Sequence, residues 1–385
     1  MKIILIFMFL YAMSYGRNVE YDFTGHVEYY MIRMKSNTIN RLDLVLNNDM
    51  VYGNNKLSIS PGYFLVDTPV YNSVNKKKIP ILNALYFNEL YYSYKYKNFI
   101  FSIGLFPFRK GSFYEYSFND VQTGIGLYTL TDVTLQGVVG TYINGTNITQ
   151  IGHVGFDSYF KSFKDFNKGD SDITFDSYKD SGMNFLINKC TYGKWYTELQ
   201  LSFMYQYVNG VRILDTDNYA LGISYDDRLD TGRTYYSIIA HSRTSGDNTA
   251  LSPFKVPYDD KQYHFGKVKT SGYHMLVGVK QDIDNFIYKK DLVFGAEYLY
   301  QSAGYHSLTV GRPLSPSSYG DIGDTYSTYI GIRIDKSNLI KLRYYKYYQS
   351  DKTIKYGLTP VTTDAKNIKG PGNHSFIGLQ WYYDF

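Results

Sequence analysis

The chain of 385 residues contains a single cysteine, Cys190. One cysteine cannot form an internal disulfide, although an exported chain could carry one. Cys190 also lies far from the N-terminal region, which argues against a lipid anchor attached to a cysteine after cleavage. The fold must therefore be held together by something other than covalent cross-links.

Long hydrophobic runs are also missing. After the first sixteen residues, no segment approaches eighteen continuous apolar residues, which excludes membrane-spanning helices. The first sixteen residues themselves have a basic Lys2, an apolar run over Ile3–Ala12 and small residues at Ser14–Gly16. This pattern predicts a cleaved export signal over residues 1–16, with a mature chain that begins near Arg17.

The motifs of catalytic and metal sites are absent as well. The seven histidines are scattered, and there is no His-Glu-x-x-His or Cys-x-x-Cys pair for a metal. Neither a Gly-x-Ser-x-Gly elbow nor a phosphate-binding Gly-Lys-Ser/Thr loop occurs. His26 stands between Asp22 and Glu28 and could suggest a general base, but a polar cluster is the expected reading. We predict no enzyme, no cofactor and no metal.

Tyrosine, in contrast, is abundant, with 44 residues against two tryptophans. Its ring suits β-strands, and its hydroxyl suits the boundary between membrane and water. The mean hydropathy is mildly polar, at −0.32. A water-filled barrel has this composition because only alternate residues face lipid. The formal charge of +5 is small and scattered, so no nucleic-acid partner is expected.

The last eleven residues, Ser375–Phe385, display the pattern most clearly. Large apolar residues alternate with small or polar ones, and side chains alternate faces along a strand. The large residues are Ile377, Leu379, Trp381, Tyr383 and Phe385. About ten residues also suffice for a tilted strand to cross a hydrocarbon core. A half-buried strand of a soluble β domain is the alternative for this stretch taken alone.

Sixteen segments of this kind follow one another, and their connections alternate between short and long. An even number of strands with this alternation is typical of a transmembrane antiparallel β-barrel with short periplasmic turns and long extracellular loops. The sequence therefore predicts an all-β fold with one barrel domain over residues 17–385. The predicted strands are Val19–Met31, Arg41–Asn47, Lys56–Val66, Leu85–Tyr96, Phe99–Pro107, Asp132–Tyr142, Ile148–Tyr159, Met183–Cys190, Trp195–Tyr207, Tyr219–Asp226, Tyr235–Arg243, Tyr273–Ile283, Leu292–Ser302, Tyr326–Asp335, Leu339–Gln349 and Ser375–Phe385.

Polar side chains gather on one face of these strands. Sixteen strands enclose a lumen too wide for side chains to fill, and a charge on the lipid face costs several kcal/mol. We therefore expect the polar face to line a wet interior, although some of its charges could simply pair across strands and steady the wall. The candidate lumen residues are His26, Glu28, Arg41, Asp43, Lys95, Arg333, Lys341 and Arg343.

Two charged stretches fall in predicted outer loops. Lys76–Lys78 could meet lipopolysaccharide phosphates or could simply be a soluble run. Residues 161–181 carry Asp165, Asp170, Asp172, Asp176 and Asp180. The carboxylate and glycine spacing of a calcium-binding loop is missing there, so a solvated acidic loop is expected.

Together, the export signal, the strand number, the long third outer connection and the terminal Phe385 resemble the general porins of Gram-negative bacteria. The hairpin LYFNELYYSYKYKNFIFSIGLFPFRKG is similar to the strand pair that precedes the constriction loop in that family. The resemblance implies an outer-membrane homotrimer, surrounded by lipid and lipopolysaccharide, whose channels admit small polar solutes. It also implies that Phe385, with Tyr383 and Trp381, forms an assembly signal.

The resemblance further implies an inward constriction loop at about residues 108–131. Arg109 and Lys110 open this segment, and Glu115 and Asp120 supply acids further along, so opposed charges could face each other across the passage. An outward loop over the barrel mouth is the alternative. Within transport, a sugar- or anion-selective channel remains open beside passive diffusion. Outside transport, a surface adhesin or receptor built on a barrel remains open.

Overall fold

The computed structural model describes most of the predicted strands and fewer of the connections between them. The described residues are 19–34, 37–67, 82–107, 134–155, 180–208, 210–227, 230–247, 254–255, 262–263, 267–302, 304–305, 323–349, 355–356, 359–360 and 374–385. The predicted signal at 1–16 and the predicted constriction loop at 108–131 lie outside these residues.

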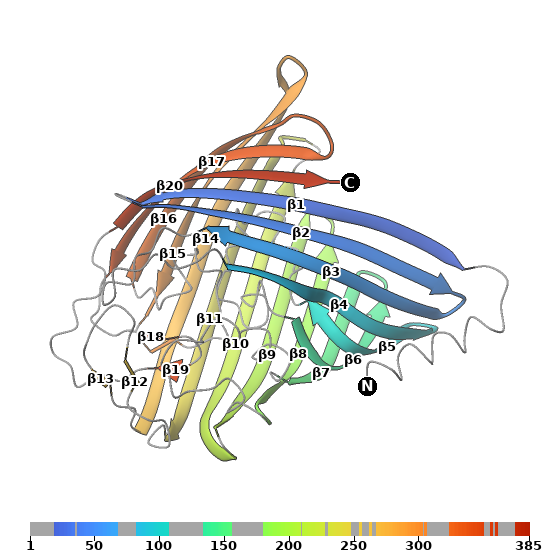
Figure 1. Ribbon diagram of the computed structural model, residues 1–385, viewed down its shortest axis with the longest axis vertical. Helices are drawn as coiled ribbons and strands as arrows, with labels where there is room; N and C mark the ends of the chain where they lie inside the picture. Colours follow the sequence, from blue (N-terminus) through green and yellow to red (C-terminus); the bar gives the residue numbers. More distant parts are fainter. Residues whose placement is uncertain are drawn as a thin grey trace.

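Sixteen antiparallel strands form a closed barrel, in which sequence neighbours pair and the last strand returns to the first (Figure 1). The strands are β1 (Glu20–Met34), β2 (Asn37–Tyr52), β3 (Asn55–Asp67), β4 (Leu82–Tyr96), β5 (Phe99–Pro107), β6 (Thr134–Asn144), β7 (Asn147–Gly155), β8 (Gly182–Tyr192), β9 (Trp195–Val208), β10 (Val211–Asp227), β11 (Arg233–Asp247), β14 (Lys267–Ile287), β15 (Lys290–Gln301), β16 (Gly323–Arg333), β17 (Asn338–Gln349) and β20 (His374–Asp384). Closure leaves the barrel without an edge strand, so every strand finds two partners.

Two small hairpins lie outside the barrel order. β12 (Phe254–Lys255) pairs with β13 (Gln262–Tyr263), and β18 (Lys355–Tyr356) pairs with β19 (Thr359–Pro360). Among the described residues, no helix is long and apolar enough to cross a membrane.

The predicted fold class is confirmed, and each of the sixteen predicted segments corresponds to one barrel strand. β5 has the predicted bounds, whereas β10 begins at Val211 rather than at Tyr219. The ladder between β9 and β10 shifts register between Arg212 and Leu214. Such a β-bulge interrupts simple alternation, which explains why the early part of β10 was not predicted.

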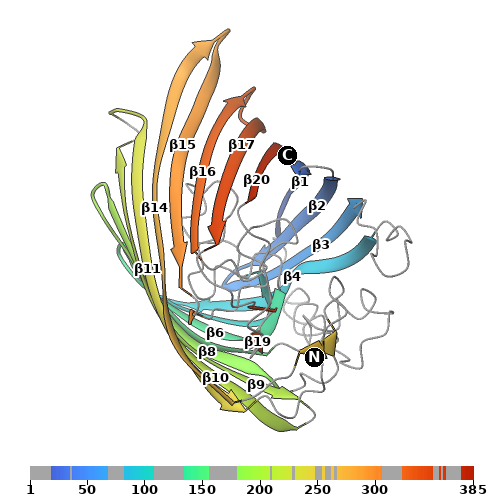
Figure 2. The same cartoon turned by 90° about the vertical axis from the view of Figure 1, so that its left-hand side faces the viewer.

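The two ends of the barrel differ, and we name them after their connections. At the turn end, tight turns join β2 to β3, β4 to β5, β6 to β7 and β8 to β9. Gly145 and Gly193 have φ angles of +58° in two of these turns, a region that glycine enters without steric cost. The opposite end, which we call the loop end, holds the strand ends that flank most of the intervals outside the described residues. Figure 2 shows the barrel after a quarter turn, with the strands curving around one interior.

The barrel closes at the turn end through Phe385. The backbone N–H of Gly25 donates to the carbonyl of Phe385 at 2.8 Å, and the N–H of Phe385 donates to the carbonyl of Gly25 at 2.9 Å. A Cβ atom on Gly25 would lie 2.5 Å from the Phe385 ring. The ring of Phe385 therefore occupies the space left by the missing side chain of Gly25. Rings of Trp381, Tyr383 and Phe385 stack in succession, with centroids 6.2 and 5.8 Å apart.

Candidate channel lumen

β9 shows most directly how the wall divides into two faces. Leu199 and Leu201 are 40% and 37% exposed, whereas Glu198 and Gln200 are each 2% exposed. Directly opposite residues of antiparallel strands share a face, so the register extends this division to the neighbouring strands. The alternation predicted for this strand therefore has its apolar side outward and its polar side inward.

The outward face of the later strands is a band of aliphatic residues between two sets of aromatic rings. Toward the turn end, Trp195 lies 5.0 Å from Tyr225 between ring centroids. Toward the loop end, Tyr298 lies 5.2 Å from Tyr326. Other exposed apolar residues on this outward face include Leu221, Ile223, Ile239, Val277, Phe294, Ile330 and Ile332. Aromatic girdles on either side of an apolar band are the pattern of a barrel embedded in a bilayer.

Glu198 is the centre of the first polar group on the inner wall. The Tyr196 hydroxyl donates to its Oε2 at 3.2 Å, and the side-chain amide of Gln200 donates to its Oε1. Lys189 Nζ, on β8, lies 4.0 Å from Oε2. Such donors and an opposite charge offset part of the cost of burying a carboxylate in the wall.

A second polar group joins β2, β3 and β4. Lys56 Nζ lies 2.6 Å from Asp49 Oδ2. The Ser58 hydroxyl lies within hydrogen-bonding distance of both Asp49 and Glu89, with Ser58 Oγ to Glu89 Oε2 at 3.1 Å. Three ionisable side chains from three strands are thus linked across the inner face.

A third polar group spans β11 to β17. The Tyr236 hydroxyl donates to Glu297, and Lys280 Nζ lies 3.0 Å from Asp282. Arg343 is 2% exposed and stands opposite Tyr329 in the register of β16 and β17. Its guanidinium carbon lies 4.9 Å from the centroid of the Tyr345 ring, a cation–π distance. Pairing within the wall thus accounts for part of the inward charge.

The structure places most of the candidate lumen residues on the inner face. His26 and Glu28 lie on inner positions of β1, opposite Asp384 and Tyr382, and Glu28 is 3% exposed. Arg41 and Asp43 lie on β2, and their backbones pair with β1. Their side chains lie outside the described part of the structure.

The remaining candidates lie on β4, β16 and β17. Lys341 shares the inner face with Arg343, is partly exposed, and has its Nζ 4.8 Å from the Tyr382 ring centroid. Lys95 and Arg333 hold inner positions close to the turn end, where Lys95 is exposed. The role of these residues in lining a channel stays a prediction.

The proposed constriction residues Arg109, Lys110, Glu115 and Asp120 lie outside the described residues. So do most of the acidic stretch at 161–181 and all of Lys76–Lys78. Within the described ranges, no three His, Cys, Asp or Glu side chains come together in a way that could hold a metal ion.

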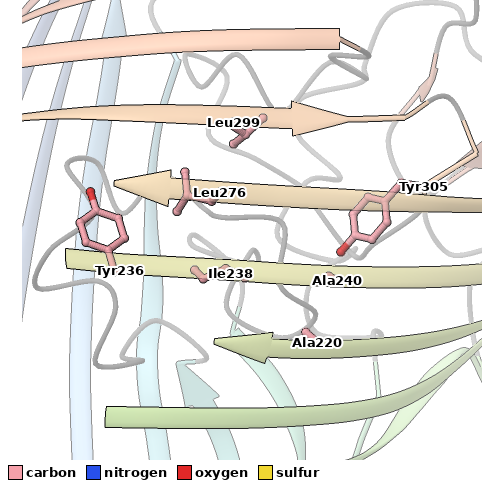
Figure 3. Close-up of a cluster of buried hydrophobic side chains, with 7 residues drawn as sticks. All are labelled: Ala220, Tyr236, Ile238, Ala240, Leu276, Leu299 and Tyr305. Atoms are coloured by element: carbon pink, nitrogen blue, oxygen red, sulfur yellow. The ribbon is translucent and has the colours of Figure 1, made fainter. Parts of the chain in front are cut away.

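The inner wall also carries an apolar cluster that the sequence reasoning missed. Figure 3 shows its seven residues on β10, β11, β14 and β15 and just beyond: Ala220, Tyr236, Ile238, Ala240, Leu276, Leu299 and Tyr305. Ile238 and Tyr305 are 0% exposed, and Leu276 is 1% exposed. The run Ser237–Ala240 places an apolar residue on both faces of β11. This break in the polar–apolar alternation was the sequence feature from which the cluster could have been predicted. This sector of the wall is therefore packed rather than in contact with water.

Comparison with known proteins places the barrel among bacterial outer-membrane structures. No family model matches the sequence, and no curated protein matches it either. Solved structures do match, among them OmpF of Salmonella typhi in complex with daunomycin, with a TM-score of 0.55 and 10% identity over 95% of this chain and 97% of that one.

The anion-selective porin from Comamonas acidovorans has a TM-score of 0.53 and 10% identity, over 96% of this chain and 100% of that one. The trimer form of OmpT, an outer membrane protein of Vibrio cholerae, gives the same TM-score at 10% identity, over 95% of this chain and 100% of that one. The fold is porin-like. At such low identity the similarity is one of backbone fold. The roles of the side chains in this wall must therefore be inferred from this sequence and structure.

Proposed function

We propose that this protein is an outer-membrane porin that forms a water-filled channel for the passive diffusion of ions and small hydrophilic solutes. The supporting observation is the division of the closed sixteen-strand wall into an outward apolar band between aromatic girdles and an inward face with ionisable side chains. In lipid, such a closed barrel satisfies every backbone hydrogen bond of the spanning strands.

Several further features belong to the same proposal. Export through a cleaved signal at 1–16 would deliver the chain to the outer membrane, where lipid and lipopolysaccharide surround it. A homotrimer is the proposed assembly, and a trimer form is described for the similar OmpT of Vibrio cholerae. A constriction at about 108–131 with Arg109, Lys110, Glu115 and Asp120 remains a proposal from the sequence.

Single-channel recording in planar bilayers tests the proposal. Steady ohmic conductance in salt is the expected result, and absence of any conductance from correctly folded protein would overturn it. In that event a surface adhesin or receptor built on the barrel becomes the better explanation.

Lys341 provides a sharper test because β17 offers a matched control. Lys341 is on the inner face, whereas Lys346 is on the outer face, and each ammonium lies over a tyrosine ring, at 4.8 and 4.9 Å from the centroid. Lys341→Glu should shift the reversal potential in a salt gradient toward cation preference, because it reverses a charge beside the ion path. Lys346→Glu should leave the reversal potential unchanged. Equal shifts from both variants would contradict the assigned faces.

A substrate-selective channel is the second candidate. Partly exposed rings of Tyr196 and Tyr382 lie on the inner face near Glu198 and Lys341, and aromatic faces beside charges suit sugar rings or anions. Concentration-dependent block of conductance by micromolar to millimolar sugar or organic anion would favour this candidate over passive diffusion.

A further inference from the structure

The chain changes direction where β15 ends. Ser302 still pairs with β14, because its backbone N–H donates to the carbonyl of Tyr273 at 2.9 Å and its hydroxyl accepts from the N–H of Tyr273 at 2.8 Å. The N–H of Tyr305 then donates back to the carbonyl of Ser302 at 3.1 Å, as in a β-turn. We call Ser302, Gly304 and Tyr305 the β15 turn. β11 and β14 continue past this level to Asp247 and Lys267, so the turn lies below the rim of the wall at the loop end.

Two glycines let the β15 turn lie directly on the inner side of β14. Gly272 is an inward position of β14, and a Cβ atom there would lie 1.9 Å from the backbone nitrogen of Tyr305. A Cβ on Gly304 would lie 2.1 Å from the carbonyl oxygen of Ser271. Such distances leave no room for a side chain, so the close approach of the two backbones requires glycine at both positions. The turn therefore crosses β14 in backbone contact, on the lumen side.

Small residues of the wall accommodate the Tyr305 ring. Ala220, Ala240 and His274 stand opposite one another in the register of β10, β11 and β14. Tyr305 belongs to the same buried cluster as both alanines, and its ring centroid lies 5.4 Å from that of His274 (Figure 3). Tyr305 and His274 are both fully buried. Because alanine leaves the space that a close-packed ring needs, this row of residues forms a socket for Tyr305 on the inner wall.

The anchored turn occupies part of the barrel interior. A chain in backbone contact with a strand lies about 5 Å from it, the spacing of neighbouring strands in a sheet. The β15 turn therefore takes space from the lumen on the side of β10–β14, at a level where the wall of β11 and β14 still continues toward the loop end. This reduction of the interior comes from the chain backbone and does not depend on a charged side chain.

We propose that the β15 turn narrows the channel near its loop end and, through Tyr305, helps to set the size of the solutes that pass. The proposal rests on the proposed function, since it presumes a conducting lumen. It concerns a different part of the chain from the predicted constriction at about 108–131, which follows β5. Tyr305 is a positioning residue here, because its buried ring holds the turn in place and does not touch the solute.

Single-channel recording in potassium chloride, with polyethylene glycols of increasing size as probes, tests this role. Tyr305→Ala removes the anchor, and Gly304→Val pushes the turn away from β14 without altering a barrel strand. Both variants should raise the conductance by roughly 1.5-fold or more and admit larger polymers, because the narrowest cross-section limits both. Tyr305→Phe keeps the ring and should conduct like the wild type. Heat-modifiable migration in gels reports the folding of each variant.

Thiol labelling of the full-length protein follows the turn independently of conduction. In a Cys190→Ser background, Ala240→Cys places a thiol in the socket of Tyr305, and Ser327→Cys places one on the inner face of β16, away from the turn. The native side chains are 1% and 4% exposed. Adding Tyr305→Ala should speed the reaction of Ala240→Cys with a small charged methanethiosulfonate about tenfold, because a covered thiol reacts only when its cover opens. The rate at Ser327→Cys should not change.

Three results would overturn the proposal. Faster labelling of Ala240→Cys with unchanged conductance and polymer size limit would mean that the turn only seals the wall. Unchanged labelling would mean that Tyr305 does not hold the turn, and equal acceleration at Ser327→Cys would mean that the whole barrel has loosened. A wild-type protein without conductance refutes the channel itself, whereas a conducting wild type with unchanged variants refutes only the role of the β15 turn.

Discussion

Two sectors of the barrel wall share one backbone geometry but differ in what they place on each face. On β15–β17 the outward residues include Ile330 and Leu342, 50% and 49% exposed, and the inner face holds Glu297 and Arg343. On β7 and β8 the outward residues include His153 and Asn184, and the inner face holds Met183 and Phe185. Strand alternation fixes that two faces exist. The residues at alternate positions of each strand decide which face is polar.

Strand length varies around the barrel wall. β7 has nine residues, near the minimum for a tilted crossing of the hydrocarbon core. β14 has 21 residues, and its hairpin with β15 projects beyond neighbouring strands at the turn end (Figure 1). β8 and β16, one from each sector, both have 11 residues, so the height of the wall does not follow the polarity of its outer surface.

The largest expected effect comes from placing a charge in each sector. Ile330→Arg should lower the free energy of unfolding in lipid vesicles by about 2–4 kcal/mol, the cost of a cation facing the middle of the bilayer. Asn184→Arg should cost less than about 1 kcal/mol, as for a charge at a membrane interface, because that position already holds a polar group. Denaturant titration followed by tryptophan fluorescence measures both. Similar losses of unfolding free energy in the two variants would contradict the assigned difference in outer-surface polarity between the sectors.

A smaller effect is expected from enlarging one glycine at the seam where β1 meets β20 and one on β6, beside the polar sector. A Cβ on Gly25 would lie 2.5 Å from the Phe385 ring and 2.9 Å from the carbonyl oxygen of Val45. Gly25→Val should therefore destabilise the barrel by about 1–3 kcal/mol, as overpacking does, and reduce the yield of folded protein. At Gly140, on β6, the nearest atom to a Cβ would be 3.8 Å away, on Ile151, so Gly140→Val should fold normally. Heat-modifiable migration in gels reports folding, and normal folding of both variants would show that the seam can adjust.

The smallest effect concerns the turns that end the two sectors. Between β16 and β17, the Asn338 side chain and the backbone N–H groups of Ser337 and Asn338 donate to Asp335, which holds the pKa of its carboxyl below the ordinary value. A lowered folded-state pKa adds stability that is complete above the unfolded pKa and is lost as the pH falls through the folded one.

Asp335→Ala should therefore slightly lower the unfolding midpoint at pH 7 and have no effect well below the lowered pKa of the folded state. The turn between β6 and β7 contains no carboxylate, so Thr146→Ala should show no such pH dependence. An Asp335→Ala effect of the same size at both pH values would mean that the charge of the carboxyl is irrelevant.

The barrel could be predicted because each strand needs only two-residue alternation, a local property of sequences such as Trp195–Tyr207. The start of β10 could not, since the bulge near Arg212 breaks this period. Among the candidate lumen residues, Glu28, Lys341 and Arg343 have inner positions that follow from alternation. Their partners could not be predicted, because pairs such as Tyr236 and Glu297 are 61 residues apart in the chain.

Sequence alone determined the fold class, the approximate strands and the direction of each face on strands such as β9, because a closed barrel is the way for many alternating strands to pair fully. The tertiary structure decided which residues from different strands are in contact. It brought Gly25 against Phe385 and packed Ile238 against Leu276, and it set Asn184 beside Phe203. These contacts depend on the register between strands, which shifts every neighbour when it moves by one residue and is settled only when all sixteen strands close.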